Sequence, residues 1–101
     1  MSGGRVEYLP EASREVEDAF EWYLDRSAQA AEAFLREIDR AVAVVVGAPH
    51  VWPRFEAGTR RYLLQRFPYS VIYRETGSGI EVIAVAHHKR RPRYWNRRLR
   101  R

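Results

Sequence analysis

The sequence predicts an α+β fold with the element order β-α-α-β-β-β, in which a twisted antiparallel sheet carries an N-terminal helical hairpin on one face. Three observations predict this fold. Two stretches near the N-terminus repeat apolar residues at helical spacing, three later stretches are rich in β-branched and aromatic residues, and turns containing Gly or Pro separate them. The chain has 101 residues, 46% of them hydrophobic, which is enough for one packed core. We therefore expect a single domain over residues 1–101.

A short strand and a first helix are predicted at the N-terminal end. Val6 and Tyr8 flank Glu7 in the alternation of a half-buried strand. Pro10 ends this strand and suits the first turn of a helix. The apolar side chains that follow have the spacing of one helical face: Ala12, Val16, Ala19, Phe20, Tyr23 and Leu24.

A second helix follows almost at once. Ser27 is its expected N-cap, apolar residues recur at helical spacing over residues 34–45, and Gly47 and Pro49 are expected to end it. Because only two or three residues join the two helices, they must run antiparallel and form a helical hairpin.

Three strands are predicted in the second half of the chain. Residues 60–67 and 69–75 are rich in β-branched and aromatic residues and are separated by Pro68. TGSG at 76–79 is a turn signal, and residues 80–88 form the last strand. Because that turn is so short, the last two strands must form an antiparallel hairpin.

Charge is distributed very unevenly along the chain. The net charge is +5, yet residues 1–58 carry 11 acidic and 6 basic residues, and residues 59–101 carry 2 acidic and 12 basic residues. The first part therefore has a net charge of −5 and the second a net charge of +10. Such a field attracts polyanions or an acidic partner.

Several classes of protein and site are not expected. The chain has no apolar run of 18 residues and no apolar segment of a signal peptide, so neither a membrane span nor secretion is predicted. It has no cysteine, which excludes disulfides and thiolate metal sites and fits a reducing, cytoplasmic compartment. We expect no cofactor.

The basic residues of the second half recur near the predicted strand ends, and we expect them to converge on the uncovered face and rim of the sheet. Such a groove suits phosphate groups or an acidic target. Tyr94 and Trp95 are expected to stack on bases there. The cations are Arg60, Arg61, Arg66, Arg74, Lys89, Arg90, Arg91 and Arg93.

Two adjacent histidines end the last predicted strand. By strand alternation, His87 and His88 lie on opposite faces of the sheet. Either one is a general acid or base among many cations, or it is a strand-end histidine bonded to the backbone. A metal site needs further ligands, and His50 is remote in sequence, so no metal is expected.

Three segments, together with the element order, resemble the RelE/ParE superfamily of bacterial toxins from type II toxin–antitoxin systems, often called plasmid stabilisation proteins. They are PEASREVEDAFEWYL (10–24), RRYLLQRFPYSVIYRE (60–75) and IEVIAVAHHKRRPRYW (80–95). The phrase RFPYSVIYR, followed by an apolar strand, histidine, bases, proline and an aromatic residue, looks most like the ParE branch.

The resemblance implies a growth-inhibiting toxin and a cognate antitoxin, ParD-like or similar, as its partner. The antitoxin would bind DNA with its N-terminal half and wrap the toxin with an extended, often acidic segment. Contact with DNA would then come only through the complex. We expect the antitoxin segment to cover exposed aromatic residues such as Trp22 or Tyr23.

The resemblance leaves two biochemical classes open. RelE-like toxins cleave mRNA on the ribosome. By position, Arg61 and Arg90 would hold phosphate, and His88 or Tyr94 would move protons. The nucleases tend to have an arginine where this chain has Ser70, and a missing cation weakens stabilisation of the transition state.

The position of Ser70 favours the second class, the ParE-like toxins, which inhibit DNA gyrase by protein contact and need no catalytic set. A third interpretation is a non-toxic basic module that binds nucleic acid.

Overall fold

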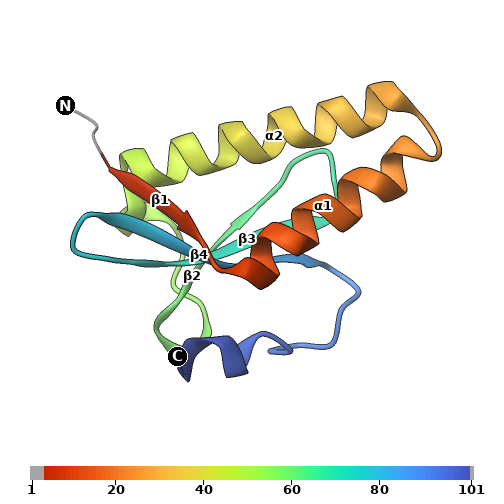
Figure 1. Ribbon diagram of the computed structural model, residues 1–101. Helices are drawn as coiled ribbons and strands as arrows, with labels where there is room; N and C mark the ends of the chain where they lie inside the picture. The colour runs from red at the N-terminus through yellow and green to blue at the C-terminus, as the bar shows by residue number, and fades with distance from the viewer. Residues whose placement is uncertain (1–3, 101) are drawn as a thin grey trace.

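The computed structural model describes residues 4–100 and has the predicted order of strands and helices (Figure 1). Three short 3-10 helices lie in the connections and near the C-terminus. The elements are β1 (Arg5–Tyr8), α1 (Pro10–Leu24), α2 (Ala28–Gly47), η1 (Pro49–Val51), η2 (Glu56–Gly58), β2 (Arg60–Leu63), β3 (Tyr69–Glu75), β4 (Gly79–His87) and η3 (Asn96–Arg100).

The sheet has the strand order β1-β4-β3-β2. Strands β2, β3 and β4 are antiparallel as predicted, but β1 lies parallel to β4, with Arg5 opposite Gly79 and Tyr8 opposite Val82. The α+β prediction is confirmed, and the sheet is mixed rather than antiparallel throughout. The reason is that no tight turn joins β1 to β4, and only such a turn forces neighbouring strands to be antiparallel.

The helical hairpin covers one face of the sheet, as predicted (Figure 1). Ser27 is the N-cap of α2, because its Oγ accepts a hydrogen bond from the Ala30 N–H at 3.1 Å. Phe34, Ile38 and Val45 of α2 are buried against Val71 and other apolar residues of the sheet. Among residues 4–100, no helix is both long and apolar enough to cross a membrane.

The opposite face of the sheet is covered by the C-terminal segment, which we define as residues 88–100 (Figure 1). Trp95 packs there on Ile72, Ile83 and Ala86. The expectation that this face is uncovered is therefore wrong. The physical reason is that this side of the sheet is also apolar, and burying it against the C-terminal segment removes that surface from water.

A β-bulge supplies part of this second apolar face. Val82 pairs with Tyr73 and Ala84 pairs with Ile72, so Ile83 is an extra residue in β4. As a result, both Ile83 and Ala84 belong to the cluster under Trp95, while Val82 belongs to the core under the helices.

Strand β2 is shorter than predicted, because it ends at Leu63 rather than at residue 67. The chain turns there, and the Glu37 carboxylate of α2 accepts hydrogen bonds from the backbone N–H groups of Gln65 and Arg66 at 2.5 and 3.2 Å. Arg66 therefore lies in a turn and not on the strand.

Candidate functional site

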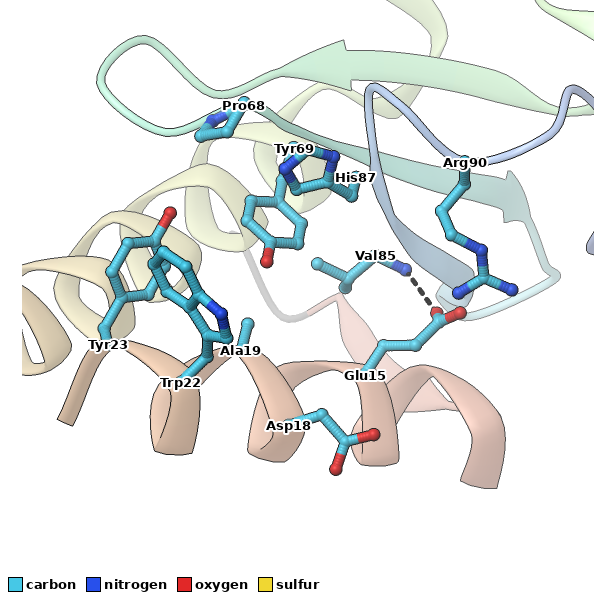
Figure 2. Close-up of a pocket in the computed structure, with 10 residues that line it drawn as sticks. All are labelled: Glu15, Asp18, Ala19, Trp22, Tyr23, Pro68, Tyr69, Val85, His87 and Arg90. Atoms are coloured by element: carbon cyan, nitrogen blue, oxygen red, sulfur yellow. Dashed lines mark hydrogen bonds between the residues drawn. The ribbon is translucent and has the colours of Figure 1, made fainter. Parts of the chain in front are cut away.

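A groove runs between α1 and the ends of β3 and β4 (Figure 2). It has a volume of about 440 Å³. Trp22 and Tyr23 of α1 stand on one side, Tyr69 and His87 on the other, and Arg90 lies at one end. Trp22 is 51% exposed, whereas Tyr23 is half-buried and packs edge-on to Phe67 and tilted against Phe34. We call this feature the α1 groove.

His87 presents its ring to the α1 groove. The ring lies edge-on to Tyr69, with the centroids 5.0 Å apart. The Lys89 N–H donates to His87 Nδ1 at 3.0 Å, so the neutral ring carries its proton on Nε2. Burial, together with the neighbouring His88 and Lys89, lowers the pKa of His87 below its ordinary value, which favours the neutral ring.

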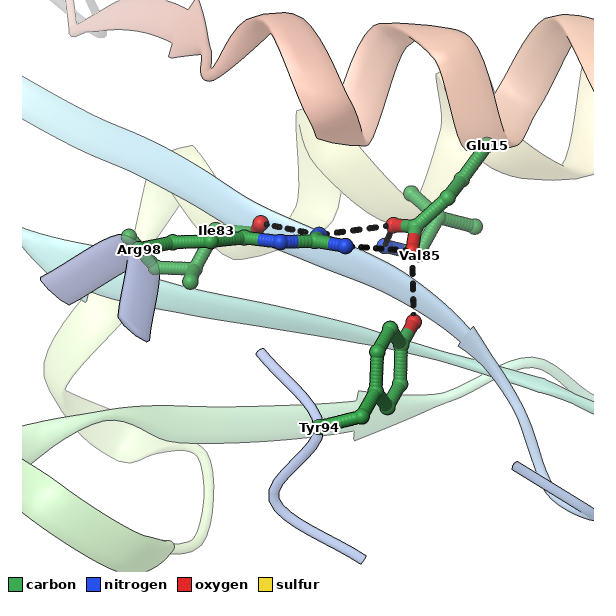
Figure 3. A network of polar contacts seen from close by, with 5 residues as sticks. All are labelled: Glu15, Ile83, Val85, Tyr94 and Arg98. Carbon is green, nitrogen blue, oxygen red and sulfur yellow. Dashed lines mark hydrogen bonds and ion pairs between the residues drawn. The ribbon is translucent and has the colours of Figure 1, made fainter. Parts of the chain in front are cut away.

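A polar network ties α1 to the C-terminal segment (Figure 3). The Glu15 carboxylate accepts hydrogen bonds from the Val85 N–H at 2.9 Å, from the Tyr94 hydroxyl at 2.6 Å, and from the Arg98 guanidinium at 2.9 and 3.1 Å. Arg98 also donates to the Ile83 carbonyl at 3.0 Å. The side chains of Glu15 and Arg98 are only 14% and 12% exposed, so this ion pair is largely buried. We call these residues the Glu15 network.

Sequence reasoning missed the Glu15 network. A carboxylate in the first turns of a helix is favoured by the helix dipole alone, and nothing in the sequence distinguishes Arg98 from the neighbouring arginines. One signal was present in the sequence. Glu15 lies three residues after Ala12 and four before Ala19, so it falls on the apolar stripe of α1, where a carboxylate needs a buried partner.

On the other side of the sheet, a hollow of about 240 Å³ lies between β2, β3 and the C-terminal segment. It brings together the four residues that the resemblance assigns to a nuclease: Arg61, His88, Arg90 and Tyr94. Arg91 also lines it. We call it the basic hollow.

Two cations of the basic hollow lie over aromatic rings. The Arg61 guanidinium carbon lies 4.3 Å from the Phe55 ring centroid, and that of Arg90 lies 3.8 Å from the Tyr94 ring centroid. Ser70, which is 4% exposed, pairs its Oγ with His88 Nε2 at 3.1 Å. The prediction that His87 and His88 lie on opposite faces is thus confirmed.

Tyr94 is unsuited to moving a proton. Burial and the hydrogen bond to Glu15 raise the pKa of the Tyr94 hydroxyl well above its ordinary value. The hydroxyl already donates its proton to that carboxylate.

The predicted single basic patch is only partly formed. Arg60, Arg66 and Arg74 lie outside the basic hollow, and each has a carboxylate partner. The distances are 3.4 Å from Arg60 to Glu75, 4.0 Å from Arg66 to Glu37 and 2.7 Å from Arg74 to Glu81. The strand register explains one pair, since Arg74 and Glu81 are directly opposite in β3 and β4.

The other residues predicted for the basic patch also differ in whether they remain available to a ligand. Arg93 lines the basic hollow but pairs with Glu56 at 3.2 Å, and Lys89 is exposed. Trp95 is 2% exposed and lies in the core beneath the C-terminal segment. The prediction that Trp95 stacks on bases is therefore wrong, because other residues of the protein already cover the indole.

A helical hairpin packed on a four-stranded mixed sheet is the fold of a ParE-like toxin domain. Residues 6–92 match the family described as the ParE toxin of the type II toxin–antitoxin system parDE. The chain belongs to this family and is a toxin of the type II toxin–antitoxin class.

One solved structure is described as the chromosomal ParDE toxin–antitoxin system from P. aeruginosa, and the chain superimposes on it with a TM-score of 0.73. The superposition covers 86% of this chain and 98% of that one, at 16% sequence identity. The comparison with curated proteins gives no match.

Proposed function

We propose that the protein acts by binding: it inhibits DNA gyrase through protein contact and is neutralised by an antitoxin segment in the α1 groove. The observation that carries this choice is the state of the basic hollow. Ser70 stands where a nuclease would place a cation, and the hydroxyl of Tyr94 is committed to Glu15. Both features count against catalysis of RNA cleavage, which stays the second candidate because Arg61, His88 and Arg90 share one hollow.

The target is tested with the purified toxin in two parallel assays, supercoiling by gyrase and integrity of ribosome-bound mRNA. We expect supercoiling to stop and the mRNA to stay intact. Tyr94→Phe is a useful companion, because it removes the hydroxyl and keeps the ring that holds Arg90. This variant should still inhibit gyrase. Cut mRNA together with untouched supercoiling would reject gyrase as the target, and failure to arrest growth on induction would favour the non-toxic interpretation.

The α1 groove has the chemistry of a site for an extended acidic peptide. Ala19 and Val85 form the apolar part of its lining beside the half-exposed Trp22. The carboxylates of Asp18 and of Glu15, which is paired with Arg98, line it as well. At one end, the Nε2–H of His87 and the guanidinium of Arg90 offer donors to a carboxylate. An antitoxin segment with one apolar anchor and one acidic residue complements these features, and the anchor would supply most of the affinity.

Trp22→Ala is therefore expected to weaken the complex with the cognate antitoxin by about tenfold or more. Leu24→Ala is the matched control, because Leu24 is a similarly exposed apolar residue of α1 that does not line the groove. Isothermal titration calorimetry measures both affinities. Equal affinity of Trp22→Ala and wild type would place the antitoxin elsewhere.

A further inference from the structure

Eight arginines of the second half of the chain fall into two groups. Arg60, Arg66, Arg74, Arg93 and Arg98 each have a carboxylate within 4.0 Å. In contrast, Arg61, Arg90 and Arg91 line the basic hollow, and none of the carboxylates in residues 4–100 forms an ion pair with them. The positive charge of the hollow is therefore not neutralised from within the described chain.

The way in which two of these arginines are held leaves their hydrogen-bond donors available. The guanidinium of Arg61 lies over the ring of Phe55, and that of Arg90 lies over the ring of Tyr94. Among residues 4–100, no side-chain acceptor takes a hydrogen bond from either guanidinium. A planar fork with free N–H donors matches the oxygens of a phosphate group. Because the rings fix these forks before any ligand arrives, less side-chain freedom is lost on binding.

The polar floor of the hollow points to the same kind of ligand. Ser70 is almost completely buried, yet it carries a hydroxyl there and holds the ring of His88 at 3.1 Å. Three cations, a hydroxyl and an imidazole around about 240 Å³ make a space for one tetrahedral anion and the chain attached to it.

We propose that the basic hollow binds the phosphodiester backbone of a nucleic acid, so that the toxin itself contacts nucleic acid and does not need the antitoxin to do so. The rings of Phe55 and Tyr94 each carry a guanidinium group on one face, and Trp95 is buried, so we expect no contribution from stacking on bases. Binding is therefore directed to the backbone and is independent of base sequence. This proposal does not rest on gyrase as the target.

The experiment uses the full-length toxin alone and a fluorescently labelled DNA duplex of about 20 base pairs, with fluorescence anisotropy recorded over a range of salt concentrations. If three arginines contact phosphates, log K should fall with log[salt] with a slope of about −3. Arg91→Ala should weaken binding equally on duplexes of different sequence and make the slope smaller by about 1.

Arg40→Ala is the matched control, because it removes the same charge from an exposed position on α2, across the sheet from the hollow. It should leave the slope unchanged. An equal effect of Arg40→Ala and Arg91→Ala would show diffuse attraction to net charge and overturn the proposal, as would absence of binding at low salt. Inorganic phosphate is titrated separately at constant ionic strength. Tighter binding of inorganic phosphate than of the duplex would assign the hollow to a small phosphate compound and likewise overturn the nucleic-acid assignment.

Discussion

Replacing Glu15 by alanine is expected to lower the free energy of unfolding by about 3 kcal/mol, the lower end of the loss when one partner of a buried ion pair is removed. The substitution leaves the guanidinium of Arg98, which is 12% exposed, without its carboxylate. It also removes the acceptor of the Tyr94 hydroxyl and of the Val85 N–H. Each of these partly buried donors then loses a hydrogen bond that water only partly replaces.

Urea unfolding followed by circular dichroism measures this loss. Glu17→Ala is the control, because Glu17 is an exposed residue of the same helix and forms no ion pair within residues 4–100. Hydrogen exchange adds a local readout, since the C-terminal segment should lose protection more than α2 does. A change in stability no larger than that of Glu17→Ala would mean that the network contributes little.

Replacing Trp95 by alanine is expected to lower the free energy of unfolding by about 3–5 kcal/mol, as is usual for a buried aromatic side chain. The indole is 2% exposed and fills the space between the C-terminal segment and Ile72, Ile83 and Ala86 of the sheet. Its removal leaves a cavity on one face of a sheet whose other core, under the helices, stays intact.

The exposed Trp22 provides the comparison for this second prediction. Trp22→Ala removes a side chain that is 51% exposed, so the free energy of unfolding of this variant should fall by only about 1 kcal/mol or less. Thermal and urea unfolding of the two variants under the same conditions test the difference. If Trp95→Ala unfolds at the same urea concentration as wild type, the C-terminal segment does not pack on the sheet in solution.

Local patterns were sufficient to predict most of the fold. The apolar spacing of residues 12–24 and 34–45 defines the two helices, and Ser27 marks the start of the second, because capping and periodicity depend on residues a few positions apart. The short turn at 76–79 likewise fixed the antiparallel β3–β4 hairpin.

Features that depend on residues far apart in the sequence were not predicted. The parallel pairing of β1 with β4 joins residues about 74 positions apart, and no local signal encodes it. The contact of Arg98 with Glu15 spans 83 positions. The burial of Trp95 has the same origin, since an aromatic residue among bases looks alike whether it faces a nucleic acid or a core.

The composition predicts an excess of arginine in the second half of the chain but not which arginines form ion pairs. The excess of positive charge after residue 58 correctly indicated a basic surface, but it did not separate cations already paired within the fold from those that remain available. Arg74 and Arg91 are equivalent by composition. Only the strand register, which sets Arg74 opposite Glu81, distinguishes them.

The extra residue in β4 has a consequence for how the two imidazoles are used. Counted by simple alternation from Val82, which faces the helices, His87 would point away from them and His88 toward them. Because Ile83 is an extra residue in β4, every later side chain points to the face opposite the one that simple alternation gives. His87 therefore lies in the groove beside Tyr69, and His88 contacts Ser70. A single irregular backbone position thus decides which histidine packs beside Tyr69 in the α1 groove and which one pairs with Ser70 in the basic hollow.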